Sequence, residues 1–270
     1  MTIGAPPTIA GAGGSAGATE AARALLAVRR GAPRLAALPP TQAPQSLAEA
    51  YAIQHALLHE LGSDIAGWKA SLSSPQEGIC APLPASAVLD APAYPALLQP
   101  PLPGSGPWGI EAEVAFRLGY DLPPLTGGAR YERGAVCAAV ASAHAVIEVI
   151  SSRYVDDDAV PHLDRVADSY MNLLLVVGPS CPSWRTLAIE ALPLELRIDA
   201  LPVHQGRGGH PLGDPLLALV WIANHLSQLG RGLRGGELVT TGSCSGVRYL
   251  SAGQTASAWF NGLGTAVVSF

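Results

Sequence analysis

Two glutamates spaced by two residues have the type and spacing of a cation site. Glu111 and Glu113 lie in GIEAEVAF, a segment of strand character. Alternate residues of a strand share one face, so the two carboxylates should point the same way about 7 Å apart, with apolar residues on the other face. Two like charges held that close attract a cation. An ordinary exposed strand face would show the same alternation and stays an alternative.

A third glutamate, Glu148, lies within the apolar run AHAVIEVI. Burying an ionised carboxylate there is costly unless it is paired or bound to a metal. Three carboxylates without a suitably spaced set of Cys or His favour a hard divalent ion, Mg²⁺ or Mn²⁺, over zinc. The alternative is a buried ion pair between Glu148 and Arg153.

Lysine occurs once in this chain, at Lys69, beside fifteen arginines. Arginine supplies a permanent positive charge, whereas burial can lower the pKa of the compact lysine amine into the working range. The single lysine therefore indicates a group that handles a proton. An ordinary surface lysine in an arginine-rich composition is the alternative.

The composition excludes several classes of protein. Of the 270 residues, 49% are hydrophobic and 14% charged, and the net charge is −5, so the chain lacks the basic field that nucleic acids or anionic membranes require. No run of about 20 apolar residues is present to span a bilayer. Residues 1–19 have neither a basic start nor a Leu-rich centre, which predicts a flexible leader and a cytoplasmic protein. The cysteines match no zinc or redox spacing and are expected to be reduced core thiols; they are Cys80, Cys137, Cys181 and Cys244.

The elements that position these residues fall into two groups. Residues 20–63 are expected to form an N-terminal helical cap, whose second helix begins at the capping box Ser46-Leu47-Ala48-Glu49 and ends near Gly62. Residues 64–270 are expected to form the metal-binding body. They carry short strand signals between Pro and Gly turns, interrupted by helices over 133–143 and 214–229. Few and irregularly placed helices favour an α+β fold with a rolled sheet over a doubly wound parallel sheet.

The chain contains, in order, a set of segments that together resemble one known family: GWK at 67–69, GIEAEVAF with DLP at 121–123, IEVISSR at 147–153, VAD at 166–168, HPLGDPLLALVWIAN with LGRGLRGGELVTTGS, and the closing GLGTAVVSF. From about Ser46 to Phe270 the sequence resembles the 2-keto-4-pentenoate hydratase branch of the fumarylacetoacetate hydrolase superfamily. The resemblance implies a mixed β-sheet roll of the fumarylacetoacetate hydrolase C-terminal-domain type.

The same resemblance implies the composition of the site. Glu111, Glu113 and Glu148 would hold Mg²⁺ or Mn²⁺, which a 2-oxo acid chelates through its carboxylate and 2-oxo oxygens, and the ion would stabilise the enolate. Lys69 would transfer a proton or orient the substrate. Substrate-binding residues are expected in three segments: Gly242 and Ser243 in the turn after ELVTT, Arg153 in IEVISSR and Asp168 in VAD.

Three positions depart from the family pattern. Hydratases of this branch carry a Pro-Asp-aromatic-Gly turn whose aspartate takes part in water addition, whereas this chain reads Pro75-Gln76-Glu77-Gly78. Glu77 is the candidate replacement for activating water. The family's ADN here ends in Ser169, and Met171 stands where a small hydroxyl residue is usual. These changes predict a bulkier, more apolar pocket and a substrate other than the simple pentadienoate.

The expected activity is that of a metal-dependent lyase of the hydratase type, which adds water to a 2-hydroxydienoate or 2-oxo-enoate as in the breakdown of aromatic compounds. Decarboxylation of a 2-oxo acid of the 4-oxalocrotonate type is the first alternative, and acylpyruvate hydrolysis is the second. A third alternative is a catalytically inactive, metal-binding assembly partner. The resemblance also implies a homo-oligomer that can associate with a decarboxylase of the family.

The histidines and a further acidic run are given lesser roles. His55 and His59 lie on the second helix of the cap without the HExxH order of a metalloprotease, so a structural role is expected. The alternative to a structural role is that His55 or His59 pairs with Glu60. Hydrolase members of the superfamily use such a Glu-His pair to activate water. Asp156–Asp158 is expected to be a solvated turn.

Overall fold

The fold is built from two β-sheets, seen in a computed structural model that describes residues 16–94 and 107–270. The larger sheet has the strand order β2-β1-β9-β4-β5-β6-β3, with β10 paired to β4. Its strands are β1 (Ile65–Ser74), β2 (Glu77–Pro84), β3 (Val88–Asp90), β4 (Trp108–Leu118), β5 (Val140–Ile150), β6 (Asn172–Val177), β9 (Leu238–Ser243) and β10 (Arg248–Leu250). The pairs β1–β9 and β3–β6 are parallel and the other neighbours are antiparallel. The predicted mixed sheet is confirmed.

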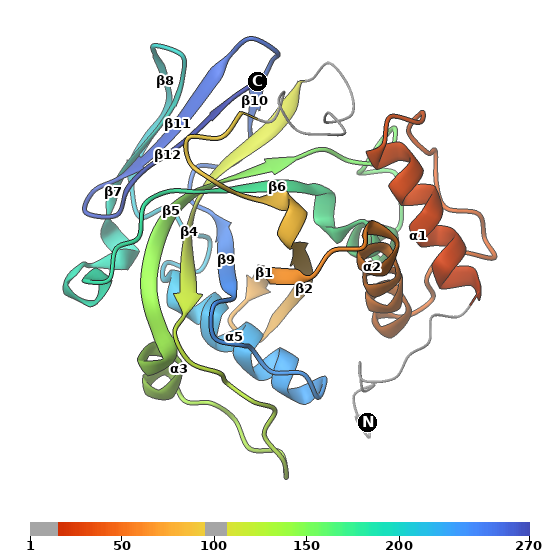
Figure 1. Cartoon of the computed structure of the whole chain (residues 1–270), viewed down its shortest axis with the longest axis horizontal. Helices are drawn as coiled ribbons and strands as arrows, with labels where there is room; N and C mark the ends of the chain where they lie inside the picture. The colour runs from red at the N-terminus through yellow and green to blue at the C-terminus, as the bar shows by residue number, and fades with distance from the viewer. Residues whose placement is uncertain (1–15, 95–106) are drawn as a thin grey trace.

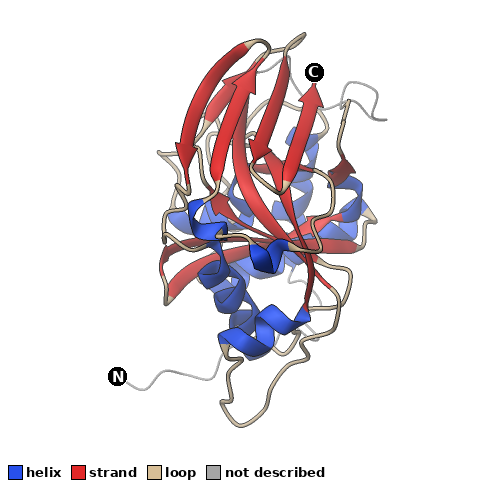
Figure 2. Ribbon diagram, turned by 90° about the vertical axis from the view of Figure 1, so that its left-hand side faces the viewer, coloured by secondary structure: helices blue, strands red, loops and turns tan. Residues whose placement is uncertain are grey.

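A smaller sheet covers one end of the larger one (Figures 1 and 2). Its strand order is β12-β11-β7-β8, and its strands are β7 (Pro193–Ile198), β8 (Leu201–Arg207), β11 (Thr255–Phe260) and β12 (Gly264–Ser269). Figure 1 shows the long strands β4 and β5 curving from this sheet toward the helices. That curvature curls the larger sheet into an open roll, whose edge strands are β2 and β3.

The α-helices lie on the side of the larger sheet away from the smaller sheet (Figure 1). They are α1 (Ala16–Arg29), α2 (Leu47–Leu61), α3 (Arg133–Ala139), α4 (His162–Ala167) and α5 (Pro215–Gln228), with short 3₁₀ turns η1 (Ala85–Ala87), η3 (Ser169–Met171), η4 (Trp184–Thr186) and η5 (Ile189–Ala191). The predicted caps are present. Ser46 Oγ accepts the Glu49 N–H at 3.2 Å, and Gly62 ends α2 with a φ of 61°. Asp214 caps α5 ahead of Pro215.

The cap helices share the core of the sheets. Leu25 of α1 and Ile53 of α2 belong to one continuous hydrophobic cluster with Trp68 of β1 and Ile110 of β4. Helix α1 begins at Ala16, so the predicted leader boundary at residue 19 is wrong; residues 1–15 of that leader lie outside the described residues. The predicted helix over 133–143 also ends early. From Val140 onward the chain forms β5, because its backbone pairs with β4.

One glycine is required where two strands approach closely. A Cβ on Gly67 would lie 2.2 Å from the carbonyl oxygen of Leu238, in the parallel pair β1–β9. The same register sets Lys69 beside Thr240. The glycine of the GWK segment therefore allows the close contact of β1 with β9 that sets Lys69 beside Thr240.

None of the described helices is both long and apolar enough to cross a membrane. The four cysteines are free thiols; Cys80, Cys181 and Cys244 are buried and Cys137 is partly buried.

Candidate metal centre

The strand register gathers the three glutamates. Glu111 on β4 lies directly opposite Glu148 on β5 in the antiparallel pair, and Glu113 follows two residues along β4 on the same face. One carboxylate oxygen from each of the three residues lies within 4.8 Å of the others. Glu113 and Glu148 are buried and Glu111 is partly exposed. The alternative of an ordinary exposed strand face is therefore wrong.

A β-bulge orients Glu113. The β4–β9 register changes between the pairs Glu113–Ser243 and Ala115–Thr240, so β9 has one extra residue there. Gly242, with a φ of 109°, occupies the bulge. Its N–H donates to Glu113 Oε2 at 3.1 Å, and the Thr240 hydroxyl donates to the same oxygen. The second carboxylate oxygen of Glu113 is left for another partner.

Glu148 has one satisfied oxygen and one unsatisfied oxygen. Oε1 accepts hydrogen bonds from Asn172 Nδ2 at 2.7 Å and from Lys69 Nζ at 2.9 Å. Oε2 is buried and has no hydrogen-bond partner among the described residues. An unpaired, buried carboxylate oxygen costs free energy, so this atom requires a ligand that the protein itself does not supply. The predicted alternative of a Glu148–Arg153 ion pair is wrong, because Lys69 takes that place.

Lys69 is buried, which excludes an ordinary surface lysine. Its ammonium group donates to Glu148 Oε1 and, at 3.1 Å, to the carbonyl oxygen of Tyr170. An ammonium group has three donors, so one hydrogen remains for the cavity. Burial alone lowers the pKa of Lys69, but the neighbouring charges of Glu148, Glu111 and Glu113 outweigh it and the pKa is raised.

The three carboxylates outnumber the one amine. Burial, together with Glu148 and Glu111, raises the pKa of Glu113 to about 8. Burial and Glu148 also raise the pKa of Glu111, which Lys69 and the Ser243 hydroxyl oppose. A hard divalent cation would compensate this excess of negative charge and supply the partner that Glu148 Oε2 lacks. The residues present therefore fit such an ion.

A cavity of about 270 Å³ opens onto the carboxylates. Besides the glutamates and Lys69 it is lined by Tyr170, Met171 and His210. His210 accepts the Leu212 N–H at Nδ1, so its Nε2 carries the proton that it donates to the carbonyl oxygen of Thr241 at 2.7 Å. Both ring nitrogens are engaged, so His210 holds the β9 end of the site in place.

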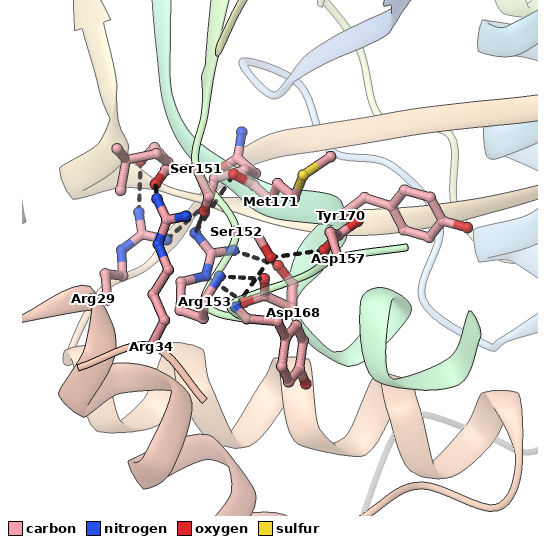
Figure 3. A network of polar contacts seen from close by, with 12 residues as sticks. Arg29, Arg34, Ser151, Ser152, Arg153, Asp157, Asp168, Tyr170 and Met171 are labelled. Atoms are coloured by element: carbon pink, nitrogen blue, oxygen red, sulfur yellow. Dashed lines mark hydrogen bonds and ion pairs between the residues drawn. The ribbon is translucent and has the colours of Figure 1, made fainter. Parts of the chain in front are cut away.

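A left-handed turn forms one wall of this cavity. Ser169, Tyr170 and Met171 have φ values of 54°, 47° and 63°. Three consecutive non-glycine residues in this region are strained and persist only when their surroundings fix them. Arg153 provides that fixation. The Arg153 side chain is buried and pairs with the Asp168 carboxylate (Figure 3). It also donates to the carbonyl oxygen of Asn172, directly after the turn, at 3.0 Å.

Four sequence-predicted residues have positions that differ from their expected roles. Arg153 and Asp168 do not line the cavity and instead support the turn that does. Gly242 lines the cavity, but its N–H is used by Glu113. Glu77 is exposed at the hairpin between β1 and β2 and is absent from the cavity lining, because the turn of Pro75 and Gln76 is too short to fold back over the site.

The remaining predictions for polar residues divide between the cavity and the surface. Ser243 lines the cavity, and its buried Oγ makes no hydrogen bond of normal geometry with a described residue, although the hydroxyl faces Glu111 closely enough to oppose the rise in its pKa. His55 and His59 lie on α2 outside the cavity lining, and the structural role expected of them stays a prediction. Asp156 and Asp158 are exposed.

The rolled mixed sheet and the glutamate site define a protein of the fumarylacetoacetate hydrolase type. Residues 67–270 match the family described as fumarylacetoacetate (FAA) hydrolase C-terminal, which is more than half of the chain, so this chain belongs to that family. Several relatives in sequence are named hydratases, as the sequence motifs predicted. The chain is 33% identical to the 2-keto-4-pentenoate hydratase of Burkholderia vietnamiensis and 34% identical to that of Paraburkholderia phymatum, each over 161 residues.

These matches cover part of each protein. The aligned segment is 60% of this chain and 60% of the length of both hydratases. A 2-hydroxyhexa-2,4-dienoate hydratase of Comamonas testosteroni is 28% identical over 59% of each chain.

Among solved structures, 4-oxalocrotonate decarboxylase from Pseudomonas putida G7 in complex with magnesium and adipate has the same fold. The TM-score is 0.78 at 20% identity, and the match covers 94% of this chain and 97% of the decarboxylase. At a TM-score of 0.50, a fumarylpyruvate hydrolase from Pseudomonas aeruginosa in complex with Mn²⁺ and pyruvate covers 71% of this chain.

Proposed function

We propose that this protein is a hydro-lyase that adds water to a 2-hydroxydienoate or 2-oxo-enoate, with Mg²⁺ or Mn²⁺ held by Glu111, Glu113 and Glu148. The observation that carries the proposal is the buried Glu148, with one oxygen on Lys69 and the other unpartnered beside two more carboxylates. The named hydratases among the relatives and the magnesium- and manganese-bound structures of the same fold support it.

The bound ion would act as a Lewis acid on the 2-oxo group of the substrate. The chain itself fixes the ligands. Gly242 and Thr240 hold Glu113, and Asn172 holds Glu148, so the carboxylates are oriented before the substrate arrives.

The direct ion pair with Glu148 favours the protonated form of Lys69. Its remaining N–H is therefore a donor toward the cavity, where it orients an anionic or carbonyl oxygen and delivers a proton. The Ser243 hydroxyl on the cavity wall would be a second group that orients the substrate.

Decarboxylation of a 2-oxo acid is the second candidate, and the position of Glu77 favours it. Among the described residues, no carboxyl group besides the three glutamates lines the cavity, so the water that a hydratase adds has no separate carboxylate base. Loss of CO₂ needs the same stabilised oxygen anion but no such base.

A product analysis separates the two. Purified protein with Mg²⁺ is incubated with 2-hydroxydienoates and with unsaturated 2-oxo diacids, and the products are identified by mass spectrometry. Gain of water supports the hydratase, and loss of CO₂ supports the decarboxylase. Cleavage to pyruvate would indicate the acylpyruvate hydrolase, the remaining catalytic alternative.

Glu113→Gln tests the site itself. This variant should abolish turnover, whereas Glu132→Gln, which removes an exposed carboxylate, should not. If no substrate is consumed by the unmodified protein and a decarboxylase co-purifies with it, the protein is an inactive assembly partner instead. We also propose a homo-oligomer, which light scattering tests; a particle of about the monomer mass of 27.7 kDa would contradict it.

A further inference from the structure

A second cavity of about 470 Å³ adjoins the metal-site cavity, and we refer to it as the outer chamber. The two cavities share Ile150, Met171 and Val247 as lining residues. Besides these shared apolar side chains, the lining of the outer chamber includes the polar residues Ser151 and Ser152. A ligand chain that extends away from the glutamates therefore passes apolar side chains before it reaches hydrogen-bonding groups.

Arg34 is the cation of the outer chamber; no other Lys or Arg of the described segments lines it. It lies after the end of α1, and its Nη2 reaches the Ser151 Oγ at 3.4 Å (Figure 3). The side chain is exposed and takes part in none of the ion pairs formed by residues 16–94 and 107–270. A guanidinium group has five donors, so most of those of Arg34 remain available.

The neighbouring arginines differ from Arg34 in this respect. Arg29 is partly buried, and its guanidinium group is engaged by carbonyl oxygens, donating to Asn172 at 3.1 Å and to Leu173 at 2.6 Å. Arg153 is paired with Asp168. The carboxylate of the outer chamber, Asp157, accepts the Ser152 hydroxyl at 2.7 Å and forms no ion pair with Arg34. Of the three arginines Arg29, Arg34 and Arg153, Arg34 is thus the one that lines the outer chamber and has no carboxylate partner among the described residues.

We propose that Arg34 binds a second, terminal carboxylate of the substrate, so that the preferred substrates are 2-oxo dioic acids. This inference rests on the proposed function, which places the 2-oxo acid end of the substrate at the three glutamates. A carboxylate matches the planar guanidinium with two parallel hydrogen bonds. The methylene groups between the two ends would pack on Ile150, Val247 and Met171, whose unbranched side chain adapts to chains of different length.

The test compares unreactive ligands that differ only at the far end. Isothermal titration calorimetry in Mg²⁺ measures the dissociation constants of 2-oxohexanoate and 2-oxohexanedioate, and of the pair one carbon longer. The unmodified protein should bind the dioic acid of at least one pair about tenfold more tightly. Arg34→Gln should remove this preference and leave the affinity for the monoacid unchanged. Arg30→Gln, which removes an exposed charge of the same region outside the chamber lining, should retain it.

Two results would overturn the inference, and they differ from each other. If both acids of each pair bind equally, or if Arg34→Gln weakens both by the same factor, Arg34 does not recognise a terminal carboxylate, while the proposed function stands. If neither series binds in a magnesium-dependent way, the proposed function is wrong and this inference fails with it.

Discussion

Lys69 and Glu148 form a direct ion pair, with Nζ 2.9 Å from Oε1, although β9 and β4 separate their strands in the sheet. Neighbouring strands lie about 4.8 Å apart, so strands three places apart in a flat sheet are about 14 Å apart. Two long side chains that extend toward each other across a curled sheet bridge this separation. The amine and the carboxylates therefore meet only when the roll is complete.

Lys69→Met should lower turnover about 100-fold or more, because proton transfer by a positioned side chain contributes at least that factor. Steady-state kinetics at saturating Mg²⁺ checks the rate, and circular dichroism checks that the variant is folded. Lys69→Arg is the matched variant: it retains the charge but not the compact amine, and its turnover should also fall. Near-normal turnover of either variant would show that Lys69 handles no proton.

Thr240→Val should weaken magnesium binding about tenfold, because the hydroxyl that orients Glu113 is lost while the ligands themselves remain. The dissociation constant is measured by calorimetry with the metal-free protein. Thr126→Val, at an exposed position, is the control and should bind magnesium normally. Equal affinities for the two variants would contradict the orienting role of Thr240.

Arg153→Met should destabilise the protein by about 3–5 kcal/mol, because Asp168 is left as an unpaired charge in the core. Urea denaturation measures the free energy of unfolding. The partly exposed pair of Arg197 and Glu195 is the comparison, and Arg197→Met should cost less than about 1 kcal/mol. Arg153→Met should also bind substrate more weakly, because the Ser169–Met171 turn loses the support of Arg153.

His225 should make the protein less stable in mild acid. Burial lowers the pKa of His225 to about 4, from an ordinary value of 6.5. Its contribution to stability is complete above pH 6.5 and is lost as the pH falls toward 4, because the unfolded chain takes up the proton first. Between pH 7 and pH 5 the loss is about 2 kcal/mol.

Urea denaturation of the unmodified protein and of His225→Gln at both pH values measures this loss. All other groups titrate equally in the two proteins, so the difference between their pH effects reports on His225. The Gln variant should lose about 2 kcal/mol less than the unmodified protein over this range. Identical pH effects would show that His225 titrates normally.

The sequence was sufficient to predict that Glu111 and Glu113 share one face, because a strand has a period of two, and that Glu148 has a partner, because a charge in an apolar run is costly. That the three glutamates bind a metal stays a prediction. The sequence was not sufficient to predict which residue neutralises Glu148. That depends on strand order and register, which place Lys69 and not Arg153 beside it. The buried partner of Arg153 is Asp168, which is brought to it by the chain reversal through α4.

Two cavity residues carried no readable signal before the fold was known. Tyr170 belongs to a left-handed turn without a glycine, so no sequence rule for turns identifies it. His210 begins the HPLGDP segment, and its role depends on contacts with Thr241 and Leu212.

The contact between Lys69 and the turn at 169–171 is made to a main-chain oxygen of Tyr170. Any residue able to adopt the same backbone conformation presents that oxygen, so the tyrosine ring is not needed to hold the amine. The side chains at positions 170 and 171 are thus not needed for the hydrogen bond that positions the Lys69 amine. Single substitutions at positions 170 and 171 can therefore change the shape of the cavity lining while the hydrogen bond that holds Lys69 is retained.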